Sequence, residues 1–338
     1  MAPISTSNQS HPTVTVVVPT LAADEQLAQC LDSLDRQVFT DFEVMVVDNS
    51  GRGAVRPRAG VRVIANDRNV GFGAAVNQAI RESAAPFIAA LNDDATVDPQ
   101  WLSALVAAMN SHPDAGMCAS QICLASGDGL DSAGMLIGLD GSSKQRGHLE
   151  NPGSYARGGE ALLPSGCAAF YRREMLEEIG LFDESFFLYC EDTDLGLRAR
   201  WAAWECTYVP DAKVWHRYSH SAGKASTLKA YYVERNRLML AVKNLPFGML
   251  ALAPFYSIAR YFWHAVYAAS GRGKASEFRS QGSAVSLPFY VLRAYLALIP
   301  RLPQLWRERR KMKRRLTSTQ FRRLVRAHSI SARQVAAL

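Results

Sequence analysis

An apolar run that ends in two acids constrains the fold of this chain most. Phe87–Leu91 is apolar throughout, and Asn92 leads from it to the adjacent carboxylates Asp93 and Asp94. A continuous apolar run of this length is typical of a central parallel strand that is covered on both faces. Ligands of open α/β sheets bind beyond the carboxyl ends of such strands. Paired acids at that place can hold Mg²⁺ or Mn²⁺, which in turn binds a diphosphate, although an isolated Asp-Asp pair also occurs in solvated loops.

Strand-like and helix-like segments alternate around this run. Apolar, β-branched stretches at residues 14–20, 43–49 and 61–64 predict three further strands, and apolar residues at helical spacing follow Asp24. Gly71 opens another helix-like segment. Glycine allows the backbone to approach a ligand closely, and a helix start offers unpaired N–H groups to anions. The alternation predicts an α/β fold with a mostly parallel central sheet.

A second acidic cluster, Glu191, Asp192 and Asp194, precedes another helical segment. Asp192 or Thr193 can cap that helix, in which case the acids are surface groups of a capping box. His216 ends the strand-like segment that follows. A lone histidine at such a place is more often packed than a ligand, so the residue alone predicts no metal site.

The positive charge of the chain is concentrated near its end. The net charge is +7, and residues 301–326 contain eleven Lys or Arg against Glu308 alone, so this stretch carries +10 and the remainder −3. Neither an aromatic-interleaved patch nor a recognised nucleic-acid fold accompanies it, and we expect no nucleic-acid partner. Six scattered cysteines without a Cys-x-x-Cys pair predict reduced, mostly buried thiols, as in a cytosolic protein.

Two apolar, aromatic segments precede the basic stretch. Residues 248–269 and 287–302 are interrupted by Pro, Arg or His, so neither is an unbroken run of about twenty apolar residues and neither is expected to span a membrane. Apolar helices beside a basic cluster instead predict attachment to the surface of an anionic membrane. The alternatives are an oligomer interface and a helical lid followed by a solvated basic tail.

Short motifs follow one another in a fixed order along residues 13 to 244. In chain order they are Val18-Pro19-Thr20, Val47-Asp48-Asn49-Ser50, Asn69-Val70-Gly71-Phe72-Gly73 through Asn77, Leu91-Asn92-Asp93-Asp94, Gly180-Leu181-Phe182-Asp183-Glu184, the stretch from Phe187 to Leu195, His216, and the stretch from Tyr232 to Arg237. Each motif is weak alone. In this ordered combination the chain resembles the family 2 glycosyltransferases. The resemblance implies the GT-A fold, which is a Rossmann-like α/β architecture, and inverting hexosyl transfer from a nucleoside diphosphate sugar.

The resemblance also implies roles for individual residues. Asp192 would be the base that takes the proton of the acceptor hydroxyl, supported by Glu191 and Asp194. Asp94 and His216 would hold Mg²⁺ or Mn²⁺ at the leaving diphosphate. The remaining donor contacts would come from Pro19, Thr20, Asp48, Asn69, Gly71, Asn77 and Asp93. Residues 125–163, rich in Gly and Ser and only weakly periodic, are expected to form a long loop that borders the acceptor site.

Among these enzymes, the bacterial rhamnosyl- and galactofuranosyltransferases of cell-envelope glycans resemble the chain most. They commonly carry Asn-Pro-Asp where this chain has Asn92-Asp93-Asp94, and on this resemblance we expect dTDP-rhamnose as the donor. Twenty-four positions separate Asp192 from His216, which suits the base-to-histidine arrangement of the galactofuranosyl members. Processive relatives carry Gln-x-x-Arg-Trp, but Leu197 replaces the glutamine before Arg200-Trp201, so a processive polymerase is not expected.

The sequence therefore predicts three parts. They are a disordered leader at residues 1–12, a GT-A catalytic domain at residues 13–244, and a helical, membrane-associating extension at residues 245–338, apolar and then basic. The expected partners are a nucleoside diphosphate sugar, a glycan or lipid-linked acceptor and an anionic membrane surface. These partners imply a peripheral protein on the cytoplasmic face of the bacterial inner membrane, and self-association stays open.

Two alternatives to glycosyl transfer stay open at this point. A catalytically silent, nucleotide-binding membrane scaffold should have lost the acids that this chain retains. A sugar nucleotidyltransferase needs a glycine-rich phosphate loop directly after the first strand. The segment there, residues 19–23, contains no glycine.

Overall fold

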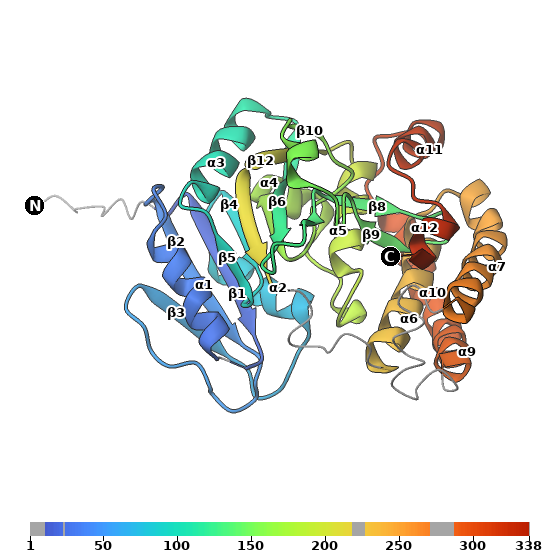
Figure 1. The fold of residues 1–338 in the computed structure, drawn as a ribbon, viewed down its shortest axis with the longest axis horizontal. Helices are drawn as coiled ribbons and strands as arrows, with labels where there is room; N and C mark the ends of the chain where they lie inside the picture. Colours follow the sequence, from blue (N-terminus) through green and yellow to red (C-terminus); the bar gives the residue numbers. More distant parts are fainter. Residues whose placement is uncertain (1–10, 23, 218–226, 271–286, 338) are drawn as a thin grey trace, which may run out of the picture.

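A ten-stranded sheet forms the centre of the computed structural model, which describes residues 11–22, 24–217, 227–270 and 287–337 (Figure 1). The predicted leader lies almost wholly outside the described residues. The strands of this sheet are β1 (Val14–Thr20), β2 (Phe42–Asp48), β3 (Val61–Ala65), β4 (Phe87–Leu91), β5 (Ala95–Val97), β6 (Ala115–Leu124), β7 (Leu130–Ser132), β10 (Gly159–Glu160), β11 (Ala168–Arg172) and β12 (Glu205–His216).

The strands follow the order β10-β12-β6-β11-β4-β1-β2-β3, with β5 beside β12 and β7 beside β6. All strands of this order except β10 and β11 run in the same direction. The predicted α/β fold with a mostly parallel central sheet is confirmed. Since β2 and β4 lie on opposite sides of β1, the winding of the sheet reverses at β1. A crevice at the carboxyl ends of the strands is expected at such a reversal.

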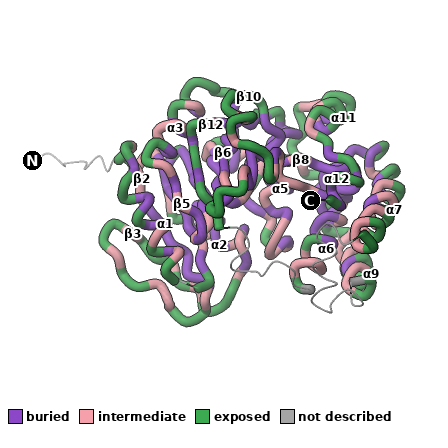
Figure 2. The backbone as a smooth tube through the Cα atoms, viewed as in Figure 1, coloured by how far each residue is buried: buried purple, intermediate pink, exposed green. Residues whose placement is uncertain are grey.

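Helices cover both faces of the sheet (Figure 1). One face packs against α1 (Glu25–Asp35) and α3 (Trp101–Ser111), and the other against α2 (Phe72–Glu82), α4 (Arg173–Ile179) and α5 (Glu191–Trp201). The alternation of side chains along β1 explains both contacts, because Val16 and Val18 point to the first face and Val17 to the second. All three valines are fully buried. Figure 2 shows that much of the central sheet is buried, since its strands are largely purple.

Residues 125–163 differ from the expected structureless loop. They contain β7 and β10 of the large sheet, a small hairpin of β8 (Met135–Ile137) and β9 (Ser143–Gln145), and the 3₁₀ helix η1 (Pro152–Tyr155). The prediction of a long loop was wrong because strands of two or three residues are too short to show a period of two in the sequence.

The C-terminal helices other than α12 share a hydrophobic core with α5. The helices of this part are α6 (Thr227–Asn244), α7 (Phe247–Ala269), α9 (Leu287–Leu298), α10 (Leu302–Lys311), α11 (Ser318–Ala327) and α12 (Ala332–Ala337), and the 3₁₀ helices η2 (Glu184–Phe186) and η4 (Ile299–Arg301) complete the described elements. Trp201 of α5 stacks on Phe321 of α11 with ring centroids 3.9 Å apart. This core therefore crosses residue 245, where the extension was predicted to begin.

The basic stretch is folded onto the rest of the chain. Arg309 is buried, and it donates a hydrogen bond of 2.8 Å to the Val242 carbonyl near the end of α6. Leu305, Phe321 and Val325 interleave with the cations at helical spacing and are buried. The basic stretch is therefore anchored through Arg309 and these apolar residues, while most of its other cations are exposed. In the ranges given above, no helix has both the length and the apolar character needed to cross a bilayer.

The cysteines agree with the prediction of buried, reduced thiols. All six are free, and each is buried except Cys123, which is half-buried.

Candidate active site

A cavity of about 1110 Å³ opens at the carboxyl ends of β1 and β4. Nine residues that the sequence singled out line it, namely Pro19, Thr20, Asn69, Gly71, Asp93, Asp94, Glu191, Asp192 and His216. Residues distant in the sequence therefore meet in one cavity at the point where the winding of the sheet reverses.

Strand pairing brings Asp94 and His216 together. β5 pairs antiparallel with the end of β12, with Ala95 opposite His216, and the backbone N–H of Arg217 donates to the Asp94 carbonyl at 3.1 Å. Asp94 Oδ1 and His216 Nε2 consequently lie 3.2 Å apart, and both side chains are buried.

The pair fits a divalent cation. Two adjacent ligands of an octahedral Mg²⁺ or Mn²⁺ with bonds of about 2.1 Å lie roughly 3 Å apart, close to the observed separation. Within the described ranges no group of three or more His, Cys, Asp or Glu side chains could hold a metal ion. A cation at Asp94 and His216 would therefore draw its other ligands from a phosphate-bearing substrate and from water, as Mg²⁺ commonly does.

Asp131 supports the histidine from behind. His216 Nδ1 lies 2.7 Å from Asp131 Oδ2, and Nδ1 of His148 lies 3.4 Å from the other carboxylate oxygen. Burial opposes ionisation of Asp131, but its hydrogen bonds with the two histidines keep its pKa below the ordinary value. A proton on Nδ1 leaves the Nε2 lone pair directed at Asp94, which is the form that binds a metal. Sequence analysis missed Asp131, because it lies in the segment expected to be a loop.

Asp93 turns toward β1 instead of toward the histidine. Thr20 Oγ1 donates to Asp93 Oδ2 at 2.6 Å, which joins the ends of β1 and β4 across the crevice. Burial raises the pKa of Asp93 to about 6, and the neighbouring Asp94 carboxylate adds to the shift.

The loop before α5 adopts an unusual backbone conformation. Phe187, Tyr189 and Cys190 all have positive φ, from 65° to 69°. Non-glycine residues in this region cost of order 1–3 kcal/mol each, so the surroundings must hold the loop in place. Gly71 provides one contact: a Cβ built there would lie 2.4 Å from the Phe187 carbonyl oxygen, which accepts a hydrogen bond from Phe72 N–H at 3.0 Å. Only glycine allows so close an approach.

Asn236 of α6 provides the main support for this loop. Its Nδ2 donates to the carbonyls of Phe186, Leu188 and Tyr189 at 2.9, 2.7 and 2.7 Å. Asn236 is fully buried. The sequence placed Asn236 in one of the motifs but did not predict its contact with the loop.

This loop carries Asp192 into the cavity. The Gly166 N–H donates to Asp192 Oδ2 at 2.8 Å and the Thr193 N–H to Oδ1 at 2.6 Å. Burial raises the pKa of Asp192 above its ordinary value, while these hydrogen bonds favour the ionised form. A carboxylate held in this way, with an elevated pKa, suits a general base. The expectation that Asp192 or Thr193 caps α5 was wrong, because the N-cap residue is Cys190 in a left-handed conformation.

Comparison with known proteins identifies the family. The model of glycosyl transferase family 2 matches residues 15–180. An N-acetylglucosaminyl-diphospho-decaprenol L-rhamnosyltransferase of Mycobacterium tuberculosis is 31% identical over 247 residues, which cover 64% of this chain and 80% of that protein. This chain is a family 2 glycosyltransferase.

Solved structures that resemble this glycosyltransferase share its fold. One is GalNAc-T7 with UDP, GalNAc and Mn²⁺, with a TM-score of 0.56 at 12% identity over 88% of this chain and 59% of that one. Another is the mannosyltransferase PcManGT from Pyrobaculum calidifontis in complex with GDP-Man and Mn²⁺, with a TM-score of 0.50 at 16% identity over 85% and 87% of the two chains. The GT-A fold predicted from the sequence is confirmed.

Glu191 lines the cavity beside Asp192 and is buried. Burial, with a contribution from the Asp192 carboxylate, raises the pKa of Glu191 to about 8. Glu191 is therefore protonated at neutral pH, and among the described residues its Oε2 has no hydrogen-bond partner.

Three of the predicted site residues of this glycosyltransferase do not line the cavity. Asp48 accepts hydrogen bonds from the N–H groups of Ser50 and Val55 at 2.8 and 2.9 Å, so it shapes the loop after β2. Asn77 pairs with both backbone groups of Phe182 at 2.9 and 3.0 Å. The expectation that Asn77 lines the nucleotide pocket was therefore wrong.

Asp194 is the third, and its side chain joins α5 to α6. It forms ion pairs with Arg198 at 2.8 Å and Lys243 at 3.2 Å and is fully buried. Asp194 therefore points away from Asp192, because the fourth residue of a helix lies on the opposite side from the second.

Proposed function

We propose that this glycosyltransferase transfers a rhamnosyl group, with inversion, from dTDP-rhamnose to a hydroxyl of a sugar that is linked to a lipid through a diphosphate. The observation that carries the proposal is that one cavity is lined by the Asp94–His216 pair, by Asp192 and by Thr20 and Asn69 on the nucleotide side. The name of the mycobacterial relative supports the sugar and the acceptor class.

The proposed metal ligands and the proposed base act at two different ends of the cavity. Asp94 and His216 would hold a divalent cation, which would supply positive charge to stabilise the leaving diphosphate. Asp192 accepts the proton of the acceptor hydroxyl. At the same time the hydroxyl oxygen forms a bond to the anomeric carbon, and dTDP departs. Asp131 keeps His216 in the ligating tautomer and acts as a positioning residue. A single displacement by the acceptor inverts the anomeric centre.

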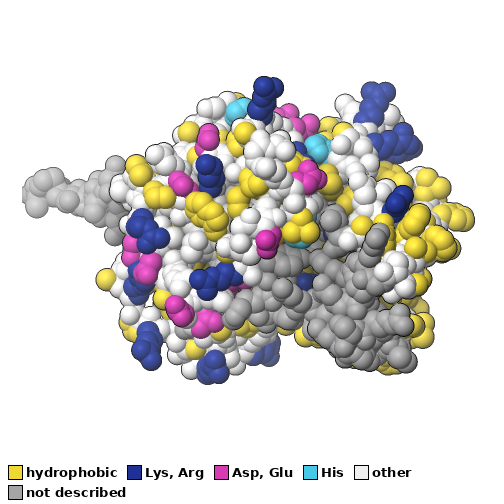
Figure 3. Space-filling model, viewed as in Figure 1, with side chains coloured by type: hydrophobic (Ala, Val, Ile, Leu, Met, Phe, Trp, Pro, Cys, Tyr) yellow, Lys and Arg dark blue, Asp and Glu magenta, His cyan; other side chains and the backbone are white. Residues whose placement is uncertain are grey.

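The exposed apolar residues of the C-terminal helices support attachment to a membrane surface. We define the apolar face as the exposed residues Leu252, Phe255, Ile258, Phe262 and Val266 of α7, Phe289, Leu292 and Leu296 of α9, and Ile299 of η4. Figure 3 shows part of it as the yellow side chains on the right of the molecule, over α7. Exposed apolar clusters of this kind mark contact with a protein or a membrane. A lipid-linked acceptor favours the membrane, with the protein peripheral on its cytoplasmic side.

Nucleotide binding and transfer test this function separately. A thermal-shift panel of nucleoside diphosphates with and without Mn²⁺ should single out dTDP, because a ligand at about 100 times its Kd adds about 2.7 kcal/mol to the free energy of unfolding. Asp192→Asn should keep that shift and lose transfer by about a thousandfold or more. Asp114→Asn, at an exposed acid, is the matched control. Near-normal transfer by Asp192→Asn would refute the assignment of the base.

A further inference from the structure

The β8–β9 hairpin forms part of the cavity wall next to the proposed base. Ser142, Ser143 and Gln145 line the cavity, as do residues of α6, α7 and α9. Each strand of the hairpin has only three residues. A two-stranded hairpin is at best marginally stable by itself. Its position therefore depends on the elements that it contacts.

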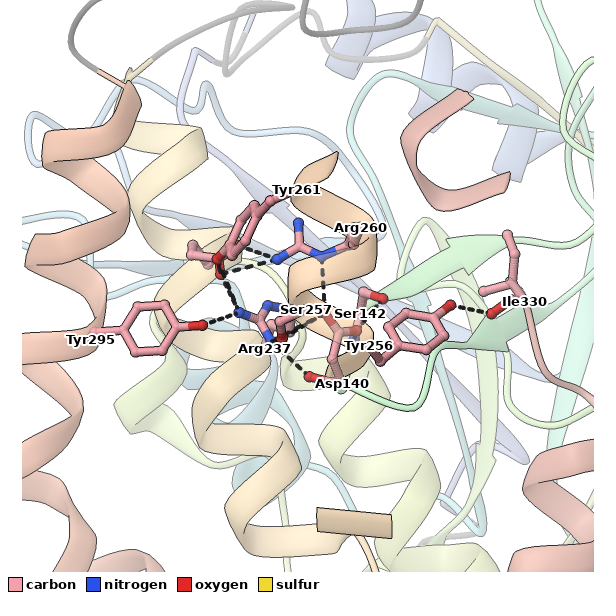
Figure 4. A network of polar contacts seen from close by, with 10 residues as sticks. Asp140, Ser142, Arg237, Tyr256, Ser257, Arg260, Tyr261, Tyr295 and Ile330 are labelled. Atoms are coloured by element: carbon pink, nitrogen blue, oxygen red, sulfur yellow. Dashed lines mark hydrogen bonds and ion pairs between the residues drawn. The ribbon is translucent and has the colours of Figure 1, made fainter. Parts of the chain in front are cut away.

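Asp140 fixes the turn of the hairpin to α7 (Figure 4). It is fully buried, and its Oδ1 accepts hydrogen bonds from the Ser142 N–H at 3.1 Å and the Ser142 hydroxyl at 2.6 Å. Its Oδ2 accepts from Ser257 at 3.2 Å and from Arg260 Nε at 2.9 Å, both of α7. Burial opposes ionisation of Asp140, but the charges of Arg237 and Arg260 keep its pKa below the ordinary value. The turn is therefore held by a buried carboxylate.

The same turn is fixed to α6. Arg237 Nη1 donates to the Asp140 carbonyl at 2.9 Å. Glu234, one turn earlier in α6, forms ion pairs with both Arg237 and Arg260. Gly141 has a φ of 83°, and a Cβ built there would lie 2.6 Å from the Arg237 carbonyl oxygen, so only glycine allows this close approach. Since the network joins the turn to α6 and α7, the hairpin cannot move without the loss of buried ion pairs.

The second strand of the hairpin contacts the residue beside the base. The Thr193 hydroxyl lies 3.2 Å from Ser143 Oγ of β9 and 3.1 Å from Asp192 Oδ1. Thr193 is fully buried in α5, and its N–H donates to the same carboxylate oxygen. Thr193 therefore bridges the hairpin and the base. A shift of β9 would displace the hydroxyl, and with it the carboxylate that the hydroxyl helps to hold.

We propose that the β8–β9 hairpin positions the base. Asp140 docks the hairpin on α6 and α7, and Ser143 of the same hairpin holds the Thr193 hydroxyl against the base. Asp140, Ser143 and Thr193 are then positioning residues that act through Asp192. The proposal rests on the proposed function for the role of Asp192.

The ionisable groups around Asp192 have to be kept constant in any test. Glu191 and Cys190 adjoin it in the chain, and Tyr171 of β11 interacts with it electrostatically. The charge of Arg237 acts on Cys190 from α6. Substitutions at Thr193 and Ser143 leave all of these groups in place. A change in the titration of the base therefore reports its contact with the hydroxyl.

The role of Thr193 is tested by the pH dependence of kcat in the full chain, with Mn²⁺, dTDP-rhamnose and N-acetylglucosaminyl diphosphofarnesol as the acceptor probe. Thr193→Val keeps the shape of the side chain but removes a hydrogen bond to the ionised carboxylate, so the acid limb should move up by about one pH unit. kcat at pH 7 should fall about tenfold or more. Thr193→Ser keeps the hydroxyl and should restore most of the wild-type behaviour. Thr319→Val, at an exposed threonine, is the matched control.

The role of the hairpin is tested by variants that leave α5 unchanged. Ser143→Ala should lower kcat by about three- to tenfold and Asp140→Asn by about tenfold or more, while the Kd of dTDP stays within about twofold. Either change combined with Thr193→Val should lower kcat little further than Thr193→Val alone, because residues that act through one contact are not additive. Ser154→Ala, at an exposed serine of the same segment, is the control. If Asp140→Asn does not fold, Ser143→Ala decides the test.

The outcomes separate this proposal from the proposed function. Wild-type kcat in a folded Ser143→Ala protein would overturn the role of the hairpin, as would losses that multiply in the double variants. A loss of dTDP affinity as large as the loss of kcat would show general disruption and would also overturn it. Near-normal transfer by Asp192→Asn would refute the base itself, and this proposal with it. Transfer that needs Asp192 but neither Ser143 nor Thr193 would overturn this proposal alone.

Discussion

Asp131 lies 2.7 Å from Nδ1 of His216 and fixes the ring so that Nε2 faces Asp94. This carboxylate–histidine arrangement recurs behind metal-binding histidines, where the outer carboxylate fixes the tautomer and raises the basicity of the ligand. The contact links β7, a strand in a segment with only weak periodicity, to the proposed metal ligands Asp94 and His216.

Replacement of Asp131 by Asn should weaken the metal site without removing a ligand. We expect the Mn²⁺ concentration for half-maximal transfer to rise about 10- to 100-fold, the usual effect of losing such a carboxylate. Asp128→Asn, at an exposed acid before the same strand, is the control. Wild-type metal dependence in Asp131→Asn would show that His216 is oriented by other contacts or is not a ligand.

Asn236 should govern the position of Asp192 through the loop before α5. Asn236→Leu removes the amide group whose two hydrogens are shared among three loop carbonyls, so the free energy of unfolding should fall by about 2–4 kcal/mol. A displaced base should lower kcat by about tenfold or more while the Kd of dTDP changes little. Denaturant unfolding and single-turnover transfer measure the two effects, with the exposed Asn110→Leu as control. An equal loss of nucleotide affinity would indicate general disruption instead of a positioning role.

Glu191 should make the free energy of unfolding depend on pH. Its pKa is about 8 in the folded protein and about 4.3 in an unfolded chain. Between these values the folded state holds more protons than the unfolded state, so the free energy of unfolding falls as pH rises, by up to about 1.4 kcal/mol per pH unit. Below the pKa of the unfolded chain, the contribution of Glu191 to the free energy of unfolding is constant and at its maximum.

Glu191→Gln keeps the shape of the protonated side chain and should remove this dependence. Urea unfolding at pH 5, 6.5 and 8 should show that the free energy of unfolding of Glu191→Gln increases relative to that of the wild type as pH rises. The exposed Glu177→Gln serves as the control. If the difference in the free energy of unfolding between wild type and Glu191→Gln were the same at all three pH values, Glu191 would be ionised throughout this range.

The apolar face should determine attachment to vesicles. Phe255 and Phe262 of α7 are 70% and 60% exposed. Their double replacement by Ser should lower the partition coefficient on anionic vesicles by at least about tenfold, since each inserted ring contributes roughly 1.5–3 kcal/mol. Val38→Ser with Leu149→Ser, at exposed apolar residues outside the apolar face, should have no such effect. Equal loss in both pairs would argue against a specific membrane surface.

Local sequence patterns predicted much of the catalytic core. The apolar run before Asp93 gave β4 its central place, because four or five consecutive apolar residues have to be buried on both faces of a sheet. The acids at the ends of strands indicated the cavity, since parallel strands bring their carboxyl ends to one edge. The order of short motifs was sufficient to indicate the family, which the comparisons confirm.

Long-range pairing decided what the sequence left open. Nothing local distinguishes Asp131 from a loop acid, or Asn236 from a helix surface residue, because their partners lie 85 residues and about fifty residues away along the chain. The error at Asn77 is of the opposite kind. Its place in a motif predicted a contact with the donor, but its side chain lies in the interior and bonds to the backbone of Phe182.

The sequence by itself therefore determined the alternation of strands and helices, the central position of β4 and the acids available for chemistry, all of which depend on neighbours within a few residues. Only the tertiary structure decided which acid faces which partner, that the basic stretch folds onto α5 and α6, and that α6, α7 and α9 enclose an arm of the cavity. These features depend on the register of β5 with β12 and on the packing of helices far apart in the chain, and such contacts leave no periodic trace in the sequence.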